Sequence, residues 1–377
     1  MLTAGRHPFF VSCAPGVEPL LHAEMQALAL SKVERQVGGC YFEGSLFDAM
    51  RANLWLRTAV RVLLRVARFG ADDEATLYKG VQEVDWSRYV GADGTLSVDA
   101  SSTMSKLDHT LFVAQRTKDA ICDQFRESAG KRPSVDRSDA DLGIFVHLVR
   151  DRCTVLIDTS GQSLHKRGWR RVQGRAPLSE TLAAAVVLAS GWDRRQPLVD
   201  PFCGSGTILV EAALIAANTA PGSFRKQFAF ERWPGHEADA WQRLRDDAFA
   251  AQRPLPKLRL VGLDVDPKAL GGARENAIAA GVSERIDLEQ GDAREFDPRP
   301  GWNAAIVSNP PYGERIGRDV ERLLASFGKV LASRASGSRL ALLLPAGTAT
   351  TLGLPNLSTT PLANGGIPCE LAIGEIP

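Results

Sequence analysis

The sequence lacks the residue patterns of several protein classes. It has no C-x-x-C pair, and its six cysteines and six histidines are scattered without the spacing of metal ligands. This distribution argues against a disulfide framework and against a zinc site, and it favours reduced thiols in a cytoplasmic protein. No apolar stretch is long enough to span a bilayer, and the N-terminus lacks a basic-then-apolar leader. We therefore expect a cytoplasmic protein with no metal and no membrane partner.

Two phosphate-binding motifs are also missing. No Gly-Lys-Ser or Gly-Lys-Thr occurs, which excludes a P-loop, and the G-x-G-x-x-G of dinucleotide-binding domains is absent. The net charge is only +1, so the distribution of charge, rather than its total, must indicate any nucleic-acid partner. The chain has 377 residues, of which 44% are apolar and 24% charged, and is long enough for two or three globular domains.

The tetrapeptide Asn309-Pro310-Pro311-Tyr312 is the most informative motif, and it follows an apolar run typical of a buried strand. Two consecutive prolines fix φ and remove two backbone donors, so the turn after the strand is stiff. The Asn309 side-chain oxygen and the Pro310 carbonyl can then act as preset acceptors for the two donors of an exocyclic NH2 group. The Tyr312 ring offers a face for stacking a planar base. An ordinary turn is the alternative, because Asn-Pro and Pro-Pro are common in loops.

A second motif lies about a hundred residues upstream. An apolar strand at 198–200 runs into the glycine turn Cys203-Gly204-Ser205-Gly206, and a helix is predicted over 208–217. Glycine lets the backbone of such a turn pass close to a ligand, because it has no Cβ. Since the phosphate-binding spacings are absent, the pattern predicts a cofactor that contains an adenosine but no phosphate.

Carboxylates end two further predicted strands of the same region. Asp264 follows the apolar run at 259–263, and Asp292 follows a strand predicted at 286–290. A carboxylate at the end of a strand can accept hydrogen bonds from both ribose hydroxyls, which we expect of Asp264. Asp292 is placed to accept from an adenine amino group. Asp266 is interpreted as the N-cap of the helix that follows it.

Taken together, these motifs resemble the S-adenosylmethionine-dependent RNA guanine-N2 methyltransferases that carry a THUMP RNA-binding domain, and most closely the bacterial enzymes acting on 23S ribosomal RNA. The resemblance is carried by Asp200-Pro-Phe-Cys-Gly-Ser-Gly-Thr207, Gly262-Leu-Asp264, Gly291-Asp292-Ala293 and Asn309-Pro-Pro-Tyr-Gly-Glu-Arg-Ile-Gly317. Residues 163–170 and 176–184 are similar to that family's junction and to its helix that covers the cofactor.

This resemblance implies an α/β fold: a Rossmann-like methyltransferase domain with a mostly parallel seven-stranded sheet, preceded by an α+β ferredoxin-like and THUMP module. It implies S-adenosyl-L-methionine as cofactor and direct transfer of the methyl group to N2 of a flipped-out guanine in RNA. Asn309, Pro310 and Tyr312 become the amino-group clamp. The cofactor contacts become Asp200, Cys203, Gly204, Gly206, Asp264, Asp292 and Asn309.

Other substrates and a non-enzymatic role remain open at this stage. The best-known proteobacterial members continue into a second methyltransferase whereas this sequence ends at Pro377, and stand-alone THUMP enzymes of similar layout methylate tRNA guanine. The same clamp also suits adenine N6 in DNA or RNA, or a glutamine side chain. A ribosome-assembly factor that binds RNA without catalysis is the alternative of another class, although it would need neither the intact clamp nor the carboxylates.

A basic segment precedes the methyltransferase region. Residues 164–175 carry five cations, no acid and one tryptophan. Contact with RNA phosphates and stacking of a base on the tryptophan are the predicted roles, and a tryptophan packed between domains is the alternative. The predicted RNA contacts are Lys166, Arg167, Trp169, Arg170 and Arg171.

Periodicity divides the chain into four parts. We expect a ferredoxin-like α+β unit at 1–68, a THUMP-like RNA-binding domain at 69–163, a basic linker at 164–175 and the methyltransferase domain at 176–377. Residues 218–247 interrupt the strand–helix alternation and contain an apolar stretch at 228–233, which predicts a packed insertion. An antiparallel edge is expected from strands at 340–344, around 362 and at 370–373.

Overall fold

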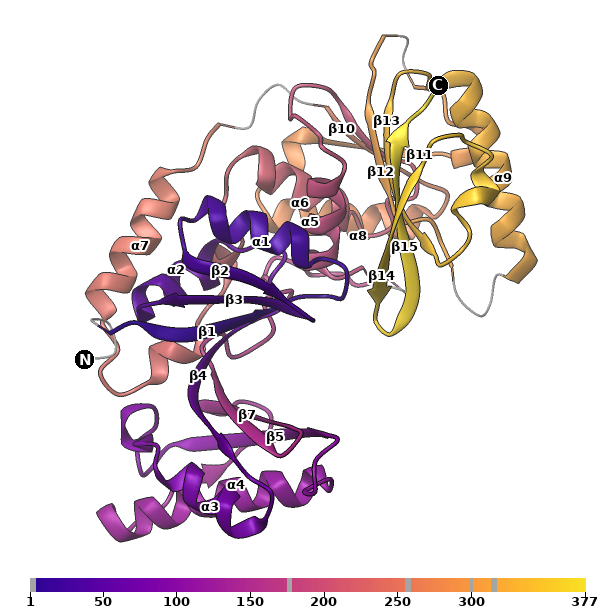
Figure 1. Ribbon diagram of the computed structural model, residues 1–377. Coiled ribbons are helices and arrows are strands. Elements are labelled where there is room, and N and C mark those ends of the chain that lie inside the picture. The colour runs from indigo at the N-terminus through magenta and orange to yellow at the C-terminus, as the bar shows by residue number, and fades with distance from the viewer. Residues whose placement is uncertain (1–4, 175–177, 255–258, 299–300, 313–316) are drawn as a thin grey trace.

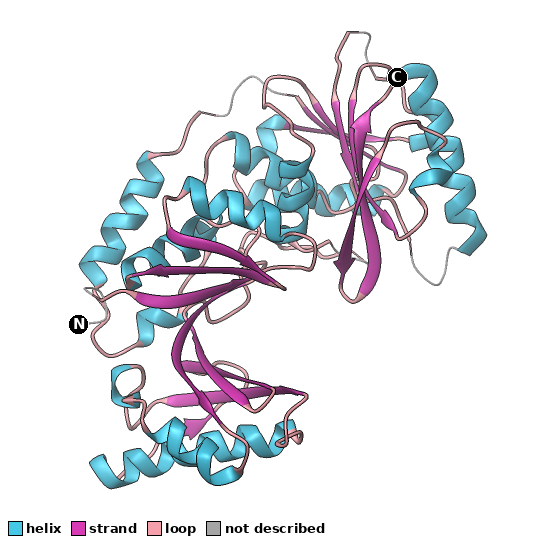
Figure 2. Ribbon diagram, viewed as in Figure 1, coloured by secondary structure: helices cyan, strands magenta, loops and turns pink. Residues whose placement is uncertain are grey.

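Two β-sheets organise the protein (Figures 1 and 2). The computed structural model describes residues 5–174, 178–254, 259–298, 301–312 and 317–377. We call residues 5–70 the N-terminal unit, 71–160 the middle unit, 161–174 the junction and 178–377 the C-terminal unit. An eight-stranded sheet A spans the first two units, and a seven-stranded sheet B forms the centre of the C-terminal unit.

Sheet A has the strand order β2-β3-β1-β4-β8-β7-β5-β6. Its strands are β1 (His7–Ser12), β2 (Ser31–Gln36), β3 (Gly39–Gly44), β4 (Arg61–Gly70), β5 (Thr95–Thr103), β6 (Ser134–Val135), β7 (Leu142–Val149) and β8 (Arg152–Asp158). β4 pairs with β1 through its first residues and with β8 along most of its length, with a register shift between Arg65 and Ala67. The predicted boundary at residue 68 therefore falls inside a strand that both units share.

Helices cover one face of each half of sheet A. They are α1 (Glu18–Ala27) and α2 (Leu46–Trp55) in the N-terminal unit, and α3 (Glu74–Gln82) and α4 (Thr110–Ala129) in the middle unit. In β7, residues 142, 144, 146 and 148 are buried, whereas the alternate residues are partly exposed. Because side chains alternate across a strand, the face of β5 and β7 opposite α3 and α4 is left open (Figure 1).

Sheet B has the order β11-β10-β9-β12-β13-β15-β14, in which the first five strands are mutually parallel and β15 pairs antiparallel with both β13 and β14. The predicted mostly parallel, seven-stranded sheet is confirmed. Its strands are β9 (Leu198–Asp200), β10 (Leu260–Asp264), β11 (Ile286–Gln290), β12 (Ala305–Ser308), β13 (Arg339–Pro345), β14 (Ser358–Asn364) and β15 (Ile367–Glu375). The central strands read as continuous apolar runs because helices cover both of their faces.

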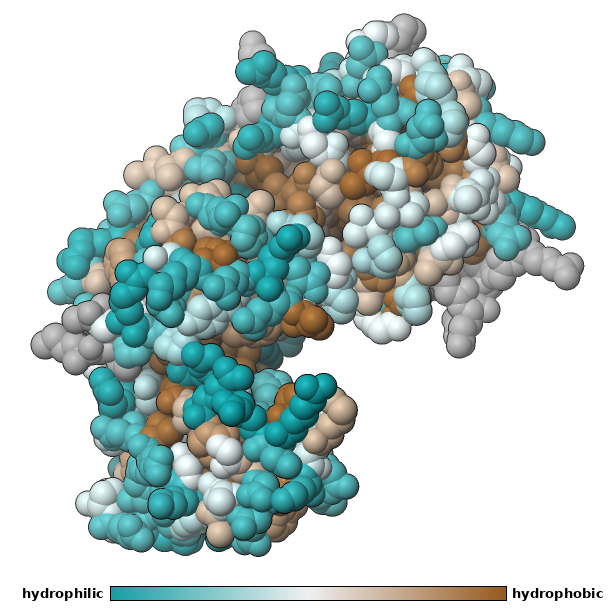
Figure 3. All heavy atoms as spheres, in the orientation of Figure 1, coloured by the Kyte–Doolittle hydropathy of each residue, from teal (hydrophilic) through white to brown (hydrophobic). Residues whose placement is uncertain are grey.

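Helices lie on both sides of sheet B (Figure 2), and an apolar core fills each side. On one face lie α5 (Glu180–Ala189), α6 (Thr207–Ala216) and α8 (Pro267–Ala279), and on the other lies α9 (Gly317–Arg334). Asp266 caps α8 through a 2.9 Å hydrogen bond from the Lys268 amide, as predicted. On the face shown in Figure 3, hydrophobic residues gather over α5, α6 and the middle strands of sheet B, whereas hydrophilic residues cover most of the middle unit. No helix among the described residues is both long and apolar enough to cross a bilayer.

The predicted insertion packs against the N-terminal unit. It contains α7 (Ala238–Ala250) and two 3-10 turns, η2 (Pro221–Phe224) and η3 (Ala229–Arg232), and both α7 and η2 contact α2. Phe228, Phe230 and Trp233 are buried, which confirms the expected packed insertion. A Cβ added to Gly222 would lie 2.9 Å from the Asn53 carbonyl oxygen, so this contact is between backbones. The C-terminal unit thus holds the N-terminal unit through a segment of its own chain.

The junction is tied into the interior by Arg167, which is 1% exposed. Its guanidinium donates to the carbonyls of Leu164 and Arg57 and lies 3.4 Å from Glu211 Oε1 on α6. Arg57 in turn donates to the Thr219 carbonyl at 2.8 Å. A single buried network therefore connects the N-terminal unit, the junction and the C-terminal unit. Burial raises the pKa of Glu211, and Arg167 opposes that shift.

We expect Arg167→Met to lower the free energy of unfolding by about 3–5 kcal/mol, because it leaves the Glu211 carboxylate buried without its ion-pair partner. Lys166→Met is the matched control, since Lys166 is exposed and should change stability by no more than about 0.5 kcal/mol. Denaturant unfolding followed by circular dichroism measures both values. Equal effects of the two substitutions would contradict the structural role of Arg167.

Candidate functional site

The predicted site residues converge at one edge of sheet B. Asp200 ends β9, Asp264 ends β10, Asp292 follows β11 and Asn309 follows β12. These four strands are parallel neighbours, so their carboxyl ends lie side by side. The chain moves outward from β9 to β10 and β11 and then crosses back to β12 on the other side of β9. Such a switch point is where open α/β sheets bind ligands.

Asp200 fastens the two strands that flank the switch point. It is 1% exposed, and its Oδ1 accepts hydrogen bonds from the Ser308 hydroxyl on β12 and, at 3.2 Å, from the Phe202 amide. Burial raises the pKa of its carboxyl to about 7, and the hydrogen bonds from Ser308 and Phe202 oppose that shift. Asp200 was predicted to contact the cofactor directly. Its observed contacts position Ser308, the residue that precedes Asn309, and the cofactor contact stays a prediction.

The glycine turn is held close to Asp264. The Gly204 amide donates to Asp264 Oδ2 at 2.9 Å, and the Cys203 amide donates to the Leu263 carbonyl at 2.9 Å. Gly206 has φ +76°, and an added Cβ would lie 3.0 Å from the Ala273 side chain on α8, so only glycine fits without strain. A Cβ added to Gly204 would meet no heavy atom within 4 Å. The turn is therefore crowded toward α8 and open in front of Gly204.

The two remaining carboxylates differ in their surroundings. Asp264 accepts from the backbone amides of Gly204 and Asp266, both at 2.9 Å, and is partly exposed. Asp292 begins a 3-10 turn and accepts from the Arg294 amide at 2.9 Å and from its guanidinium at 3.0 Å. The hydrogen bond from Arg294 lowers the pKa of Asp292. Both carboxylates are therefore held as oriented acceptors at the strand ends.

Asn309 presents an acceptor that the protein leaves unused. Its Oδ1 is buried and has no hydrogen-bond partner among the described residues. A buried polar atom without a partner costs about 1–3 kcal/mol, so its retention indicates a ligand donor. Pro310 is buried and Pro311 exposed, so the chain turns outward directly after Asn309. The rest of this motif, residues 313–316, lies outside the described residues.

Tyr312 is held in place by the hairpin of β14 and β15, which the motif itself does not reveal. Its hydroxyl accepts from Asn364 Nδ2 at 2.7 Å and lies 3.7 Å from Cys369 Sγ. Burial raises the pKa of the hydroxyl, so Tyr312 stays protonated at neutral pH. The ring packs against the core as a partly buried residue. Asn364 is thus a positioning residue that lies about fifty residues away in the sequence, beyond the reach of local patterns.

The basic junction is largely structural, which corrects part of the predicted RNA contact set. Arg167 and Trp169 are each 1% exposed, so neither offers a surface for RNA. Arg170 donates to Glu180 at 2.9 Å and to the Thr207 hydroxyl at 3.1 Å, and thereby fastens the junction to α5 and α6. The packed tryptophan that was held as the alternative is what the structure shows. RNA contact by the exposed Lys166 and Arg171 stays a prediction.

Asn276 on α8 connects the junction to the glycine turn and was not identified from the sequence. Its Oδ1 accepts from the amides of Arg171 and Val172 at 2.7 and 3.0 Å, while its Nδ2 donates to the carbonyls of Val172 and Ser205 at 2.9 and 3.0 Å. All polar atoms of this buried amide are used. The available signal was a polar residue on the same face of a predicted helix as Ala273 and Ala280.

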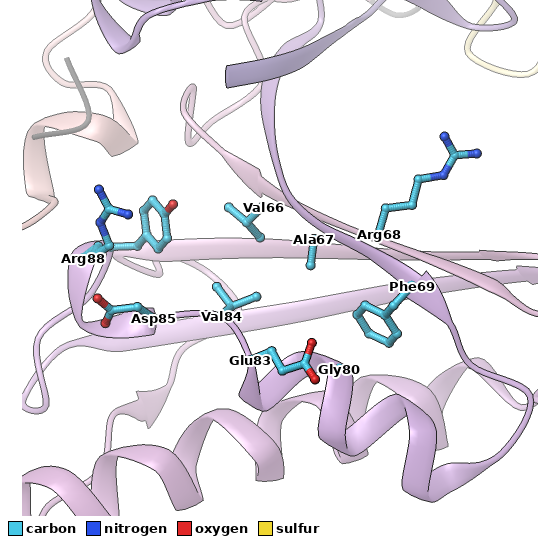
Figure 4. A pocket seen from close by; sticks show the side chains of 10 residues that line it. Val66, Ala67, Arg68, Phe69, Gly80, Glu83, Val84, Asp85 and Arg88 are labelled. Carbon is cyan, nitrogen blue, oxygen red and sulfur yellow. The ribbon is translucent and has the colours of Figure 1, made fainter. Parts of the chain in front are cut away.

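Two cavities lie away from the strand ends. One of about 450 Å³ is bordered by β4 and the end of α3, where the Phe69 ring packs on Gly80 (Figure 4). The other, of about 850 Å³, is bordered by the middle unit, the junction and the insertion. Among the described residues, no three histidine, cysteine or acidic side chains gather closely enough to hold a metal ion.

The residues at the strand ends fit an adenosine-containing cofactor. The space in front of Gly204 admits a ligand close to the backbone, and the Asp264 and Asp292 carboxylates provide acceptors for hydroxyl and amino groups. The unpartnered Asn309 oxygen lies at the end of β12, the strand that pairs with β9. The thiol of Cys203 is buried in the turn, and burial raises its pKa strongly, so it is not a nucleophile.

The raised pKa of Asp200 predicts a pH-dependent stability. The pKa of an aspartate in an unfolded chain is about 3.9. Between that pH and about 7, the folded state therefore binds more protons than the unfolded state. The contribution of Asp200 to stability therefore falls as the pH rises through this window. We expect the difference in unfolding free energy between the wild type and Asp200→Asn to decrease from pH 4 to pH 7. Asp287→Asn, which replaces an exposed carboxylate, is the control and should not show this decrease. A difference that is constant with pH would contradict the buried carboxyl.

Comparisons with known proteins agree with this geometry. Residues 167–372 match the family described as RMKL-like methyltransferase domain, residues 71–158 match the THUMP domain, and residues 8–63 match the RlmL ferredoxin-like domain. The ribosomal RNA large subunit methyltransferase K/L of Methylococcus capsulatus is 42% identical over 98% of this chain and 51% of its own length. The chain spans about half the length of the curated relatives it matches.

Solved structures of similar length share the whole architecture. The putative methyltransferase SMU.472, crystallised with SAH, is 31% identical with a TM-score of 0.89 and 98% coverage of both chains. A predicted N6-adenine-specific DNA methylase from Listeria monocytogenes is 30% identical with a TM-score of 0.88, covering 99% of this chain and 97% of its own. The chain belongs to the family of RMKL-like methyltransferases that carry RlmL ferredoxin-like and THUMP domains.

Proposed function

We propose that the protein is an S-adenosylmethionine-dependent methyltransferase that modifies the exocyclic N2 of a guanine in 23S ribosomal RNA, in the cytoplasm. The observation that carries this proposal is the buried, unpartnered Asn309 oxygen at the switch point of sheet B. The names of its relatives support ribosomal RNA as the substrate, and the SAH bound by SMU.472 supports the cofactor.

The cofactor would be held by the strand ends. Asp264 would accept from the ribose and Asp292 from the adenine amino group, while the open turn at Gly204 would let the ligand approach the backbone. When bound, S-adenosylmethionine supplies a methyl group on a positively charged sulfur. No covalent intermediate with the protein is needed, and none of the residues at the strand ends is placed as an activated nucleophile.

The substrate amine would be held by the clamp. The Asn309 oxygen and the Pro310 carbonyl would accept from the two N–H groups, orient the nitrogen lone pair and offset the positive charge that develops on nitrogen. Tyr312, fixed by Asn364, would stack on the flipped-out base. Both acceptors precede rigid prolines, so little reorganisation is required when the base enters.

Two other substrates follow from the same geometry. Guanine in tRNA would use the same clamp, and adenine N6 presents the same pair of donors. The Listeria relative is named as specific for adenine in DNA, although the THUMP match of this chain favours RNA over DNA.

Radiolabelled methyl transfer onto separated RNA pools from a strain that lacks the gene tests the substrate. Nuclease digestion and mass spectrometry identify the product. N2-methylguanosine in 23S RNA supports the proposal. Label in tRNA, on adenine or only in protein overturns the stated substrate.

We expect Asn309→Ala to lose at least about 100-fold in turnover, because a positioned polar group at the reacting centre commonly contributes that much. The affinity for SAH, measured by calorimetry, should stay within a few-fold of the wild type. Asn303→Ala is the matched control, since it replaces an exposed asparagine before the opposite end of β12. Unchanged turnover with intact SAH binding would show that Asn309 is not the clamp.

A further inference from the structure

A groove of about 850 Å³ lies between the middle unit, the junction and the insertion of the C-terminal unit. We call it the junction groove. Its floor includes Ser97 and Asp99 of β5 and Gly143 and Phe145 of β7, which lie on the open face of sheet A. In Figure 1 this face of β5 and β7 is turned away from α3 and α4 and toward the rest of the molecule.

Three buried or half-buried arginines build the walls of the groove. Arg61 binds Asp158 and the Gly161 carbonyl, and its guanidinium lies 5.5 Å from the centre of the Phe145 ring. Arg225 donates to four backbone carbonyls of residues 160–166. Arg167 is held in the interior network already described. These cations have their partners within the protein, and Arg225 holds the insertion against the junction.

Ion pairs between the insertion and the middle unit close one side of the groove. Arg232 of the insertion lies 2.9 Å from Asp139 and 3.5 Å from Asp141 in the middle unit. Of the acids that line the groove, Asp139 and Asp158 are therefore already paired with arginines.

Four further cations that line the groove are exposed and have no ion-pair partner among the described residues. They are Arg137 from the middle unit, Lys166 and Arg171 from the junction and Lys226 from the insertion. The groove thus carries unpaired positive charge contributed by three separate parts of the chain, whereas Asp99 is the one acid of its described lining without an ion-pair partner. Exposed, unpaired cations along a groove suit a polyanion whose charges are spaced along a strand.

We propose that the junction groove binds a single strand of the RNA substrate, with Arg137, Lys166, Arg171 and Lys226 contacting its phosphates and Phe145 beneath its bases. This inference rests on the proposed function and names the surface that delivers the RNA. The Arg171 amide is bonded to Asn276, which also holds Ser205 of the glycine turn. The backbone at Arg171 is therefore fixed relative to the glycine turn by two hydrogen bonds of Asn276.

The test is RNA binding by the full chain without cofactor. Fluorescence anisotropy with labelled oligouridine of about twelve nucleotides measures affinity at several salt concentrations. Lys166→Gln, Arg171→Gln and Lys226→Gln are made singly and together, and Lys329→Gln on α9 is the control, an exposed lysine at the opposite end of the molecule. Circular dichroism checks that each variant is folded.

We expect the slope of log K against log salt to fall by about 0.7 for each phosphate contact removed, so by about 2 in the triple variant. The control should keep the wild-type slope. A triple variant that binds as the wild type does, or a control that weakens binding equally, overturns the proposal. Failure of methylation assays with intact, salt-dependent binding would instead count against the proposed reaction and leave the groove assignment in place.

Discussion

The hydrogen bond between Ser308 and the buried Asp200 carboxyl joins the ends of β12 and β9, the two strands that flank the switch point. Burying a carboxyl at this place is costly, as its raised pKa shows. The bond fixes the position from which Asn309 projects, and the prolines after it prevent that position from relaxing. An acceptor held in this way needs no rearrangement to receive an amino group, which is the condition for electrostatic catalysis.

The junction contains two kinds of cationic side chain: buried or partly buried ones that form ion pairs within the protein, and exposed ones that have no such partner among the described residues. Arg167 and Arg170 are directed inward to Glu211 and Glu180, and they join the N-terminal unit, the junction and α6 into one body. Lys166 and Arg171 flank them in the sequence and are exposed. The proposed presentation of RNA requires a fixed distance between the junction and the strand ends of sheet B, and buried ion pairs supply fixed geometry more effectively than they supply stability.

Local patterns identified the strands, the glycine turn and the carboxylates because each depends on neighbours within a few residues. The ends of β9, β10 and β12 lie where the apolar runs stop, and Asp266 caps α8 as its position before proline indicates. The burial of Arg167 could not be read from its basic neighbours, because its partner lies 44 residues away. A signal existed in Glu211, an acid within an otherwise apolar helix that requires a buried cation. The polar edge strand β2 shows no such signal, since only pairing with β3 defines it.

The two halves of the proposed clamp have different physical origins. Asn309 is placed by local chain stiffness and by the parallel pairing of β12. Tyr312 depends on Asn364 in the β14–β15 hairpin, and that hairpin in turn meets the N-terminal unit, since a Cβ added to Gly16 would lie 2.1 Å from the Pro361 carbonyl oxygen. The proposed stacking surface is thus supported from the N-terminal unit, whereas the proposed acceptor is supported from within sheet B. Because packing against the N-terminal unit sets the position of Tyr312 and local geometry sets that of Asn309, Tyr312 is the half of the proposed clamp that the N-terminal unit can influence.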